Sequence, residues 1–238
     1  MSPARATVVS DAMAAVLARL HHADWSDVGR RGAEVLGVDG LSVTLAPRSA
    51  GPTGEVLWSS SALARRFDDL QFTLGCGPAI DTARSGRPVL EVDLGQVQPH
   101  RWFTLPADAE LLPVRAVFCF PLGIGAIQLG TLTAVRAAPG ELGDQQAQDA
   151  LGLAIALTAH YLDRWEPPRT LYRAVVHQAV GMLSVQLALP MADALLRLRA
   201  YAYRSGRPVN DVSHDIVTRR LRLGPDTDGT HATTEDKD

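Results

Sequence analysis

The sequence contains few of the residues on which disulfide, phosphate-loop and membrane sites depend. It has two cysteines, which are too few for a disulfide framework. Lys237 is the only lysine, so there is no glycine-rich phosphate loop with its lysine. No stretch reaches membrane-spanning length, and Asp11 and Arg19 interrupt the apolar run of residues 8–20 that a signal peptide would need. We therefore expect a soluble, cytoplasmic protein.

Motifs for catalysis are equally scarce. There is no Gly-x-Ser-x-Gly sequence, no convincing pair of carboxylates and no haem or bilin attachment motif. His21, His22 and His100 lack the spacing of metal ligands, and solvated histidines explain them better. Cys119 lies in an apolar strand and is expected to be buried, whereas Cys76 lies near a helix start, which would lower its thiol pKa. We expect no enzyme activity, no metal and no cofactor.

Charge is distributed unevenly along the chain. The formal net charge of −3 divides into −5 for residues 1–168, +6 for residues 169–223 and −4 for residues 224–238. The basic stretch holds nine arginines, three aspartates and no lysine. The acidic end is rich in Asp, Thr and Gly, which predicts disorder there.

The basic stretch is predicted to form three helices. Pro190 ends the first, Gly206 can adopt the left-handed conformation that closes the second, and Pro208 begins the third. Gly181 lies inside the first helix at a cost of about 1 kcal/mol relative to alanine, which favours a close helix crossing there. The residues expected to be buried in the second and third helices are Met191, Leu195, Leu198, Ala202, Val209, Val212, Ile216, Val217 and Leu221.

The arginines of this stretch fall into two groups. Arg219, Arg220 and Arg222 crowd the end of the third helix, where positive charge complements the helix dipole. The dipole does not account for the group around the second helix next to Tyr203, which comprises Arg197, Arg199, Arg204 and Arg207. Arginines beside an aromatic ring suit phosphates and unpaired RNA bases. From charge alone, a solvated basic face explains this group equally well.

Three runs in the basic stretch resemble the ANTAR domain, a three-helix RNA-binding domain of bacterial transcription antiterminators. They are Gln178-Ala-Val-Gly-Met-Leu183, then Ala194-Leu195 with Leu198-Arg199 and Tyr201-Ala202, then Arg207 with Val212-Ser213 and Ile216-Val217. The chain departs from many members at Val180, where they have lysine, and at Ser213, where they have alanine. The resemblance, closest to the actinobacterial type, implies RNA hairpins as the partner. The RNA-binding residues are then expected to be Arg197, Arg199, Tyr203, Arg204, Arg207 and Gln178.

The first two thirds of the chain predict an α+β domain. Helical periodicity covers residues 8–22, 28–36, 63–72 and 144–165. Strand patterns cover residues 41–45, 55–59, 88–92, 114–122 and 127–135. Residues 94–113 are polar and interrupted by prolines, which predicts a long loop.

This order of elements resembles a GAF domain over roughly residues 10–165, and Gly75-Cys-Gly-Pro-Ala-Ile-Asp-Thr-Ala83 is its most family-like run. Many relatives have Glu-Gly-Pro-Cys there, where this chain has Cys76 and Ala79 in place of the glutamate and the cysteine. The resemblance implies a sensor domain that dimerises through its terminal helices and binds a small molecule. We expect a GAF-like antiparallel sheet with flanking helices in residues 1–166, a three-helix ANTAR bundle in residues 167–223 and a disordered acidic tail in residues 224–238.

Two further sites are predicted in this half. Aromatic residues that could line a ligand pocket are Trp58, Phe67, Trp102, Phe103 and Phe118, although aromatic residues at such positions more often belong to the core. The helix of residues 144–165 has an apolar seam typical of coiled coils. It predicts a homodimer with Leu151, Ala154, Thr158 and Tyr161 at or beside the interface.

These features favour a homodimeric regulator in which a sensor domain, with an unidentified small-molecule effector, orients two RNA-binding bundles. The alternative is a small-molecule or redox enzyme or sensor built on the GAF domain, with the helical region used only for dimerisation. DNA binding is less favoured, because the connection between the second and third helices does not present an obvious base-reading helix.

Overall fold

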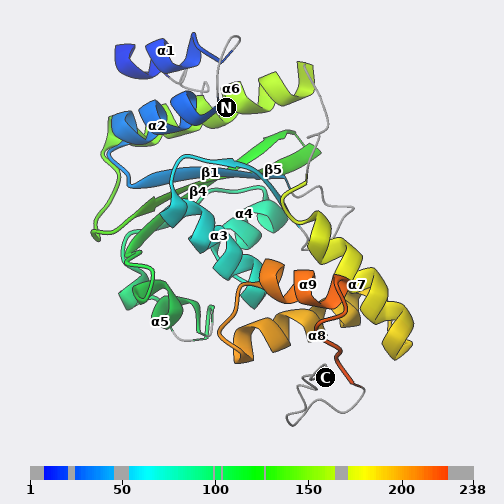
Figure 1. The fold of residues 1–238 in the computed structure, drawn as a ribbon. Coiled ribbons are helices and arrows are strands. Elements are labelled where there is room, and N and C mark those ends of the chain that lie inside the picture. Colours follow the sequence, from blue (N-terminus) through cyan, green and yellow to red (C-terminus); the bar gives the residue numbers. More distant parts are fainter. Residues whose placement is uncertain are drawn as a thin grey trace. The chain divides into compact units, whose positions relative to one another are not determined.

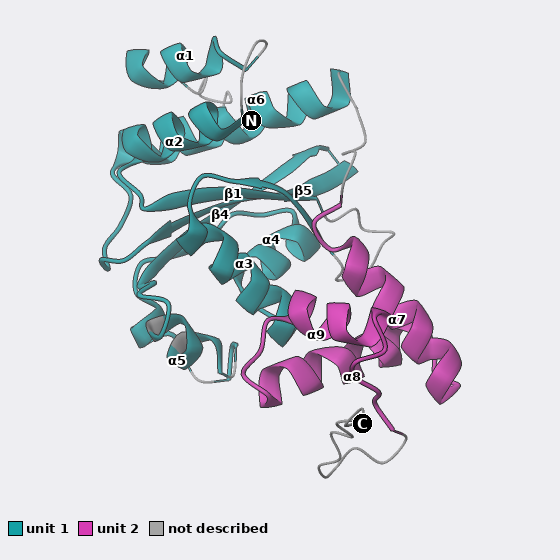
Figure 2. Cartoon of the chain, viewed as in Figure 1, with its two compact units in different colours: residues 1–169 teal, residues 170–238 magenta. Residues whose placement is uncertain are grey.

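The computed structural model describes residues 8–20, 25–45, 54–98, 100–102, 104–125, 127–163 and 171–224. The chain divides into two compact units, residues 1–169 (unit 1) and residues 170–238 (unit 2), as Figure 2 shows. The predicted tail from residue 225 onward, the last two residues of the helix predicted for residues 144–165, and Phe103 lie outside the described residues.

Unit 1 is built on a five-stranded antiparallel sheet with the strand order β2-β1-β5-β4-β3. The strands are β1 (Gly40–Leu45), β2 (Glu55–Ser59), β3 (Val89–Glu91), β4 (Ala116–Ile124) and β5 (Ile127–Arg136). Val43 of β1 lies opposite Trp58 of β2 on one side and opposite Leu132 of β5 on the other. All five strands overlap the ranges predicted from the sequence, and β4 begins and ends two residues later than predicted.

Helices cover both faces of this sheet (Figure 1). One face carries α1 (Asp11–Leu17), α2 (Trp25–Leu36) and α6 (Asp144–Asp163). The other carries α3 (Ala62–Leu74), α4 (Pro78–Ser85) and α5 (Leu105–Glu110), together with the 3-10 turn η2 (Leu94–Gln96). Because side chains alternate along a strand, Phe118 joins the core under α2 and α6, whereas Val117 and Cys119 join the core under α3 and α5.

Local signals in the sequence explain where these helices begin and end. The hydroxyls of Ser10 and Ser61 cap α1 and α3 by accepting hydrogen bonds from the backbone N–H groups of Met13 and Ala64 at 3.1 and 3.2 Å. Gly75 ends α3 in the left-handed conformation, with φ of 70°. These positions are serines and a glycine because few other residues supply such caps.

Helix α5 lies within residues 94–113, where a loop was predicted, and that prediction is wrong. Proline stands in the first turn of α5, where it costs no backbone hydrogen bond, so the proline pattern did not exclude a helix. The segment before α5 is held by Trp102, whose indole N–H donates to Asp81 of α4 at 2.9 Å.

The exposed face of α6 differs from the predicted seam. Ala154 and Thr158 are only 1% and 2% exposed, because they turn toward the interior of unit 1. The exposed large apolar residues of α6 are Leu151, Ile155 and Leu162, which are 37%, 55% and 46% exposed. Of the predicted interface residues, Leu151 lies on this exposed stripe and the two buried ones do not.

Tyr161, the fourth predicted interface residue, belongs to an aromatic cluster inside unit 1. Its ring stacks on Trp25 at 5.6 Å between ring centres, and its hydroxyl accepts a hydrogen bond from the indole N–H of Trp58 at 3.1 Å. Burial raises the pKa of the Tyr161 hydroxyl to about 12. The cluster fixes the last turns of α6 against α2 and β2.

Unit 2 consists, in its described part, of α7 (Ala174–Leu187), α8 (Met191–Arg204) and α9 (Val209–Val217). Pro190 and Pro208 immediately precede α8 and α9, and Gly206 follows α8 in the left-handed conformation with φ of 62°. The predicted fold class is confirmed: it is α+β, with an antiparallel sheet flanked by helices and then a C-terminal three-helix unit.

The core of unit 2 contains most of the residues expected there. Those that are at most 7% exposed are Leu195, Leu198, Ala202, Val209, Val212 and Ile216. Met191 is 54% exposed, because it begins α8, and its predicted burial is wrong. The predicted helix crossing at Gly181 is also wrong, since a Cβ added there would meet no atom within 4 Å. Leu223, which the helical patterns did not single out, is 1% exposed.

Candidate nucleic-acid interface

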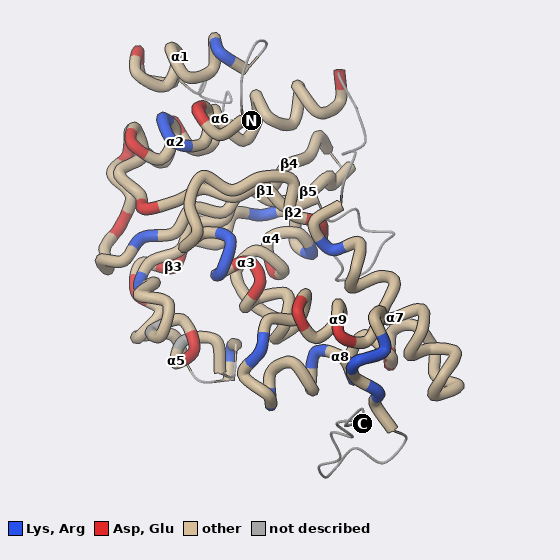
Figure 3. Tube along the Cα trace, in the orientation of Figure 1, with Lys and Arg blue, Asp and Glu red and all other residues tan. Residues whose placement is uncertain are grey.

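The outer face of α8 presents arginines beside aromatic rings. Arg197 and Arg204 are seven residues apart, which places them on one side of the helix, with Ala200 exposed between them. The guanidinium carbon of Arg204 lies 5.8 Å from the centre of the Tyr201 ring, and Tyr203 is 45% exposed. Basic residues recur along α8 and in the segment after α9 (Figure 3). The "α8 surface" denotes Arg197, Tyr201, Tyr203, Arg204 and Arg207.

Two of the predicted RNA-binding arginines, Arg199 and Arg207, are not freely exposed on the outer face of α8. Arg199 is only 7% exposed, and burial together with the charge of Arg173 lowers its pKa to about 10. It therefore remains protonated at neutral pH, but its guanidinium is mostly removed from solvent. Arg207 forms an ion pair with Asp215 at 2.6 Å, which raises the pKa of Arg207 and lowers that of Asp215. This pair ties the turn after α8 to α9.

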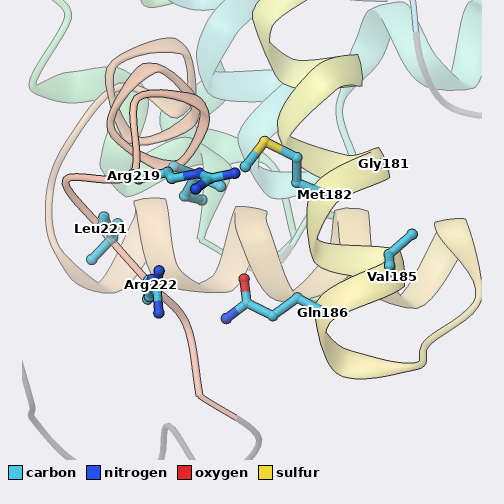
Figure 4. Close-up of a pocket in the computed structure, with 8 residues that line it drawn as sticks. Gly181, Met182, Val185, Gln186, Arg219, Leu221 and Arg222 are labelled. Carbon is cyan, nitrogen blue, oxygen red and sulfur yellow. The ribbon is translucent and has the colours of Figure 1, made fainter.

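A groove of about 560 Å³ lies between α7, α9 and the segment that follows α9 (Figure 4). The residues that line this α7–α9 groove are Gly181, Met182, Val185, Gln186, Ile216, Arg219, Leu221 and Arg222. The four from α7 share one helix face, because they are one, four and five residues apart. Gln178, the last predicted RNA-binding residue, is exposed one turn before Met182 on the same side of α7.

The segment after α9 is held in place at two points. Leu223 is buried, and its carbonyl accepts a hydrogen bond from Gln186 Nε2 at 3.1 Å. Arg219 adopts the left-handed conformation with φ of 61°, which costs an L-residue roughly 1–2 kcal/mol and is usually given to glycine. The sequence pattern placed Arg219 in the group that complements the helix dipole and gave no prediction of this groove. Gly181, which the pattern assigned to a close helix crossing, lies one turn from Gln178 and was the signal that could have indicated the groove.

The aromatic residues predicted to line a ligand pocket are not brought together. Trp58 and Phe118 belong to the core under α2 and α6, whereas Phe67 and Trp102 belong to the core under α3 and α5. The sheet separates the two pairs, because alternate residues of a strand face opposite sides. These four residues therefore cannot line a single pocket.

Polar atoms on the α3–α4 side of the sheet are buried without a hydrogen-bond partner. They are Ser42 Oγ, Gln71 Nε2 and Thr82 Oγ1. Neighbouring polar groups are paired: Gln71 Oε1 accepts from the N–H of Ala79 at 2.9 Å, and Thr131 donates to the Ala79 carbonyl at 3.3 Å. Since buried polar groups are normally satisfied, this side of the sheet is the more suitable place for a polar ligand.

Neither cysteine has the surroundings of a reactive thiol. Cys76 lies before the start of α4, but partial burial and the charge of Asp81 raise its thiol pKa, so the expected lowering is wrong. Cys119 is fully buried, as predicted, and burial raises its thiol pKa strongly. Its sulfur lies 3.7 Å from the hydroxyl oxygen of Thr133. Both thiols are neutral at physiological pH, which makes them poor nucleophiles.

Within the described residues, no group of three or more His, Cys, Asp or Glu side chains could hold a metal ion. No single described helix is long and apolar enough to cross a membrane, and α7 and α8 pass such a test only as a pair bent by 109°.

Residues 170–217 match the family model of the ANTAR domain. No curated protein matches the chain. The GAF domain of an Acinetobacter phosphoenolpyruvate-protein phosphotransferase is 10% identical, with a TM-score of 0.46 over 64% of this chain and 92% of that one. The corresponding domain from Coxiella burnetii is 15% identical, with a TM-score of 0.46 over 65% and 96%. The free methionine-R-sulfoxide reductase of Neisseria meningitidis is 13% identical, with a TM-score of 0.49 over 68% and 93%.

Proposed function

We propose that this protein is an RNA-binding regulator of transcription antitermination, in which unit 1 is a GAF-like sensor and unit 2 binds RNA hairpins. The match of residues 170–217 to the ANTAR domain carries the proposal. The charge of residues 169–223, nine arginines against three aspartates, suits a phosphate backbone. Arg197, Tyr203 and Arg204 supply guanidinium and ring surfaces for it, while Arg199 and Arg207 support α8 from its inner side and its end. The protein would act in the cytoplasm on nascent transcripts.

Fluorescence anisotropy with the full chain tests RNA binding. The probes are RNA hairpins that share one stem and carry randomised loops, and the control is a blunt RNA duplex of equal nucleotide count. We expect tighter binding to the hairpins, weakening with salt by a log–log slope of roughly −0.7 to −0.9 per phosphate contact. Equal affinity for hairpins and duplex, or no binding of either, contradicts the proposal.

We propose further that the protein is a homodimer and that α6 provides the interface. The exposed apolar stripe of Leu151, Ile155 and Leu162 supports this placement, since contiguous exposed apolar residues commonly mark protein contacts. Light scattering should give twice the chain mass for wild type and the chain mass for Ile155→Asp. Leu111→Asp, at an 80% exposed apolar position of unit 1 outside α6, is the matched control and should remain dimeric. A wild-type monomer at micromolar concentration contradicts the dimer.

The effector of unit 1 is proposed to be a small polar molecule bound on the α3–α4 side of the sheet. The buried and unpaired atoms of Ser42, Gln71 and Thr82 support this side over the predicted aromatic pocket. Native mass spectrometry of the chain purified under mild conditions should detect a bound mass that is lost from Thr82→Val but kept by Thr73→Val. Retention of the mass in Thr82→Val would place the ligand elsewhere.

An enzyme built on unit 1 is the rival function. The raised thiol pKa values of Cys76 and Cys119 do not favour it. We expect Cys76→Ser and Cys119→Ala to leave RNA affinity unchanged, and a tenfold loss in either would revive a redox role.

A further inference from the structure

The α7–α9 groove combines an apolar floor with basic edges. Ile216 is 2% exposed and forms part of the floor, while Val185 at the rim is 85% exposed. In Figure 4 the side chain of Arg219 extends toward Met182, and that of Gln186 extends toward Arg222. A slot with hydrophobic surface between guanidinium groups has the chemistry to hold a flat ring that is joined to a negatively charged group.

The arginines of the groove are not used by the fold. The side chains of Arg219 and Arg222 form no hydrogen bond or ion pair with the described residues, whereas Arg207 is paired with Asp215. Arg219 also occupies a left-handed position at which glycine would be more favourable. The charge of Arg219 complements the dipole of α9, as that of Arg220 does, but no contact within the described residues uses its guanidinium group, which leaves the side chain available to a ligand.

Gly181 keeps the groove open. It lies inside α7, where alanine would stabilise the helix, and a Cβ at this position would meet open space rather than a neighbouring helix. A larger side chain would project into the groove, because Gly181 lines it together with Met182 and Val185. The glycine thus has no packing role in unit 2, and free space in the groove is the remaining physical reason for it.

We propose that this groove receives one unpaired nucleotide of the bound RNA, with its base against Met182, Val185 and Ile216 and its phosphates on Arg219 and Arg222. Gln186 already donates to the Leu223 carbonyl, which leaves its Oε1 as an acceptor for the base edge. The volume of about 560 Å³ is within the range of pockets that enclose small ligands. The inference rests on the proposed RNA-binding function and assigns the groove as its base-recognition site.

Two variants test the groove without weakening the fold. Gly181→Leu fills the groove and should raise the helix propensity of α7. Arg219→Gly removes the side chain and relieves the left-handed position. The matched controls are Ala192→Leu, which adds the same side chain at an exposed position of α8, and Arg220→Ala, which removes a neighbouring arginine that does not line the groove.

Anisotropy with randomised-loop hairpins, the blunt duplex and free AMP provides the readout. Both groove variants should bind the hairpins about tenfold or more weakly, as expected when a stacked base is lost, and should melt no lower than wild type. Their affinity for the duplex should stay unchanged, and the controls should bind hairpins within about threefold of wild type.

Three outcomes overturn the inference in distinguishable ways. If both groove variants bind hairpins as tightly as wild type, the groove does not recognise the base, but the RNA-binding function is unaffected. If the wild type does not bind hairpins, both the role of the groove and the RNA-binding function are excluded. Tight binding of AMP that Gly181→Leu abolishes, with hairpin affinity unchanged, assigns the groove to a free nucleotide instead of RNA.

Discussion

The α8 surface and the α7–α9 groove both contain arginines, but they differ in what those arginines already do. On the α8 surface, Arg207 is paired with Asp215 and Arg204 lies over the ring of Tyr201. In the groove, Arg219 and Arg222 border apolar side chains and make no ion pair with the described residues. The density of charge along a helix indicates where a polyanion is attracted. Available guanidinium groups beside an apolar slot indicate where one nucleotide is recognised.

Disruption of the core of unit 2 should have the largest effect, because the α8 surface and the groove both depend on the same three helices. Leu198 is fully buried, and Leu198→Ala should cost about 2–5 kcal/mol of unfolding free energy in unit 2. Leu196, 65% exposed on the same helix, is the matched control, and Leu196→Ala should change stability by less than about 0.5 kcal/mol. Hydrogen exchange should show loss of protection in α7, α8 and α9, with the sheet of unit 1 still protected. Equal effects of the two leucines would contradict the packing described here.

The double variant Arg197→Ala/Arg204→Ala isolates the contribution of the α8 surface. It should keep its helical circular dichroism, bind hairpins several-fold to tenfold more weakly, and lower the salt slope by roughly 1.4–1.8 for two lost phosphate contacts. Because these residues attract the backbone, affinity for the duplex should fall as well, unlike in the groove variants. Arg66→Ala/Arg87→Ala removes the same charge from exposed positions of unit 1 and should leave the slope unchanged. An unchanged salt slope in the α8 double variant would show that the α8 surface does not contact the RNA.

Arg219→Gly tests, through stability alone, whether the arginine of the groove has a structural role. Relief of the left-handed conformation should raise the unfolding free energy of unit 2 by up to about 1 kcal/mol, offset in part by the greater freedom of glycine in the unfolded chain. Arg220→Gly, at the next position, should not stabilise. Thermal unfolding followed by circular dichroism measures both. If Arg219→Gly destabilises unit 2, the arginine has a structural role that the left-handed position does not reveal.

The smallest expected effect is the pH dependence of the Arg207–Asp215 pair on the α8 surface. The hydrogen bond from Arg207 lowers the pKa of Asp215 in the folded chain. Asp215 therefore contributes stability above its unfolded pKa of about 3.9, and this contribution is lost as the pH falls through the lower folded value. The difference in unfolding free energy between wild type and Asp215→Asn should be below about 1 kcal/mol at pH 7 and should vanish toward pH 2. A difference that grows as the pH falls would show that the pair has been assigned wrongly.

The sequence predicts the order of elements well, because each strand and cap has a local cause. Alternation of apolar residues places β1 and β2, the serines before α1 and α3 supply caps, and Gly206 closes α8. Helix α5 was missed, because proline in a first turn resembles proline in a loop. Local patterns therefore specify elements more reliably than they exclude them.

The candidate site was harder to predict, because periodicity identifies an apolar face without naming what covers it. The α6 seam through Ala154 and Thr158 is covered by the chain's own unit 1, and Gly181 faces a groove rather than a helix. The conformation of Arg219 depends on how the segment after α9 returns to α7, which involves the burial of Leu223. Such long-range contacts leave no repeating signal in the sequence.

The central claim, that unit 2 binds RNA through the α8 surface and the groove, is tested most directly by ultraviolet crosslinking of the full chain to RNA in cells. Mass spectrometry of the crosslinked peptides identifies the contacting residues. We expect crosslinks in residues 171–224, concentrated on peptides that contain Met182 to Gln186 and Tyr203, with few in the sheet of unit 1. Crosslinks confined to unit 1, or none above the level of an Arg197→Ala/Arg204→Ala/Arg219→Gly variant, would contradict the account.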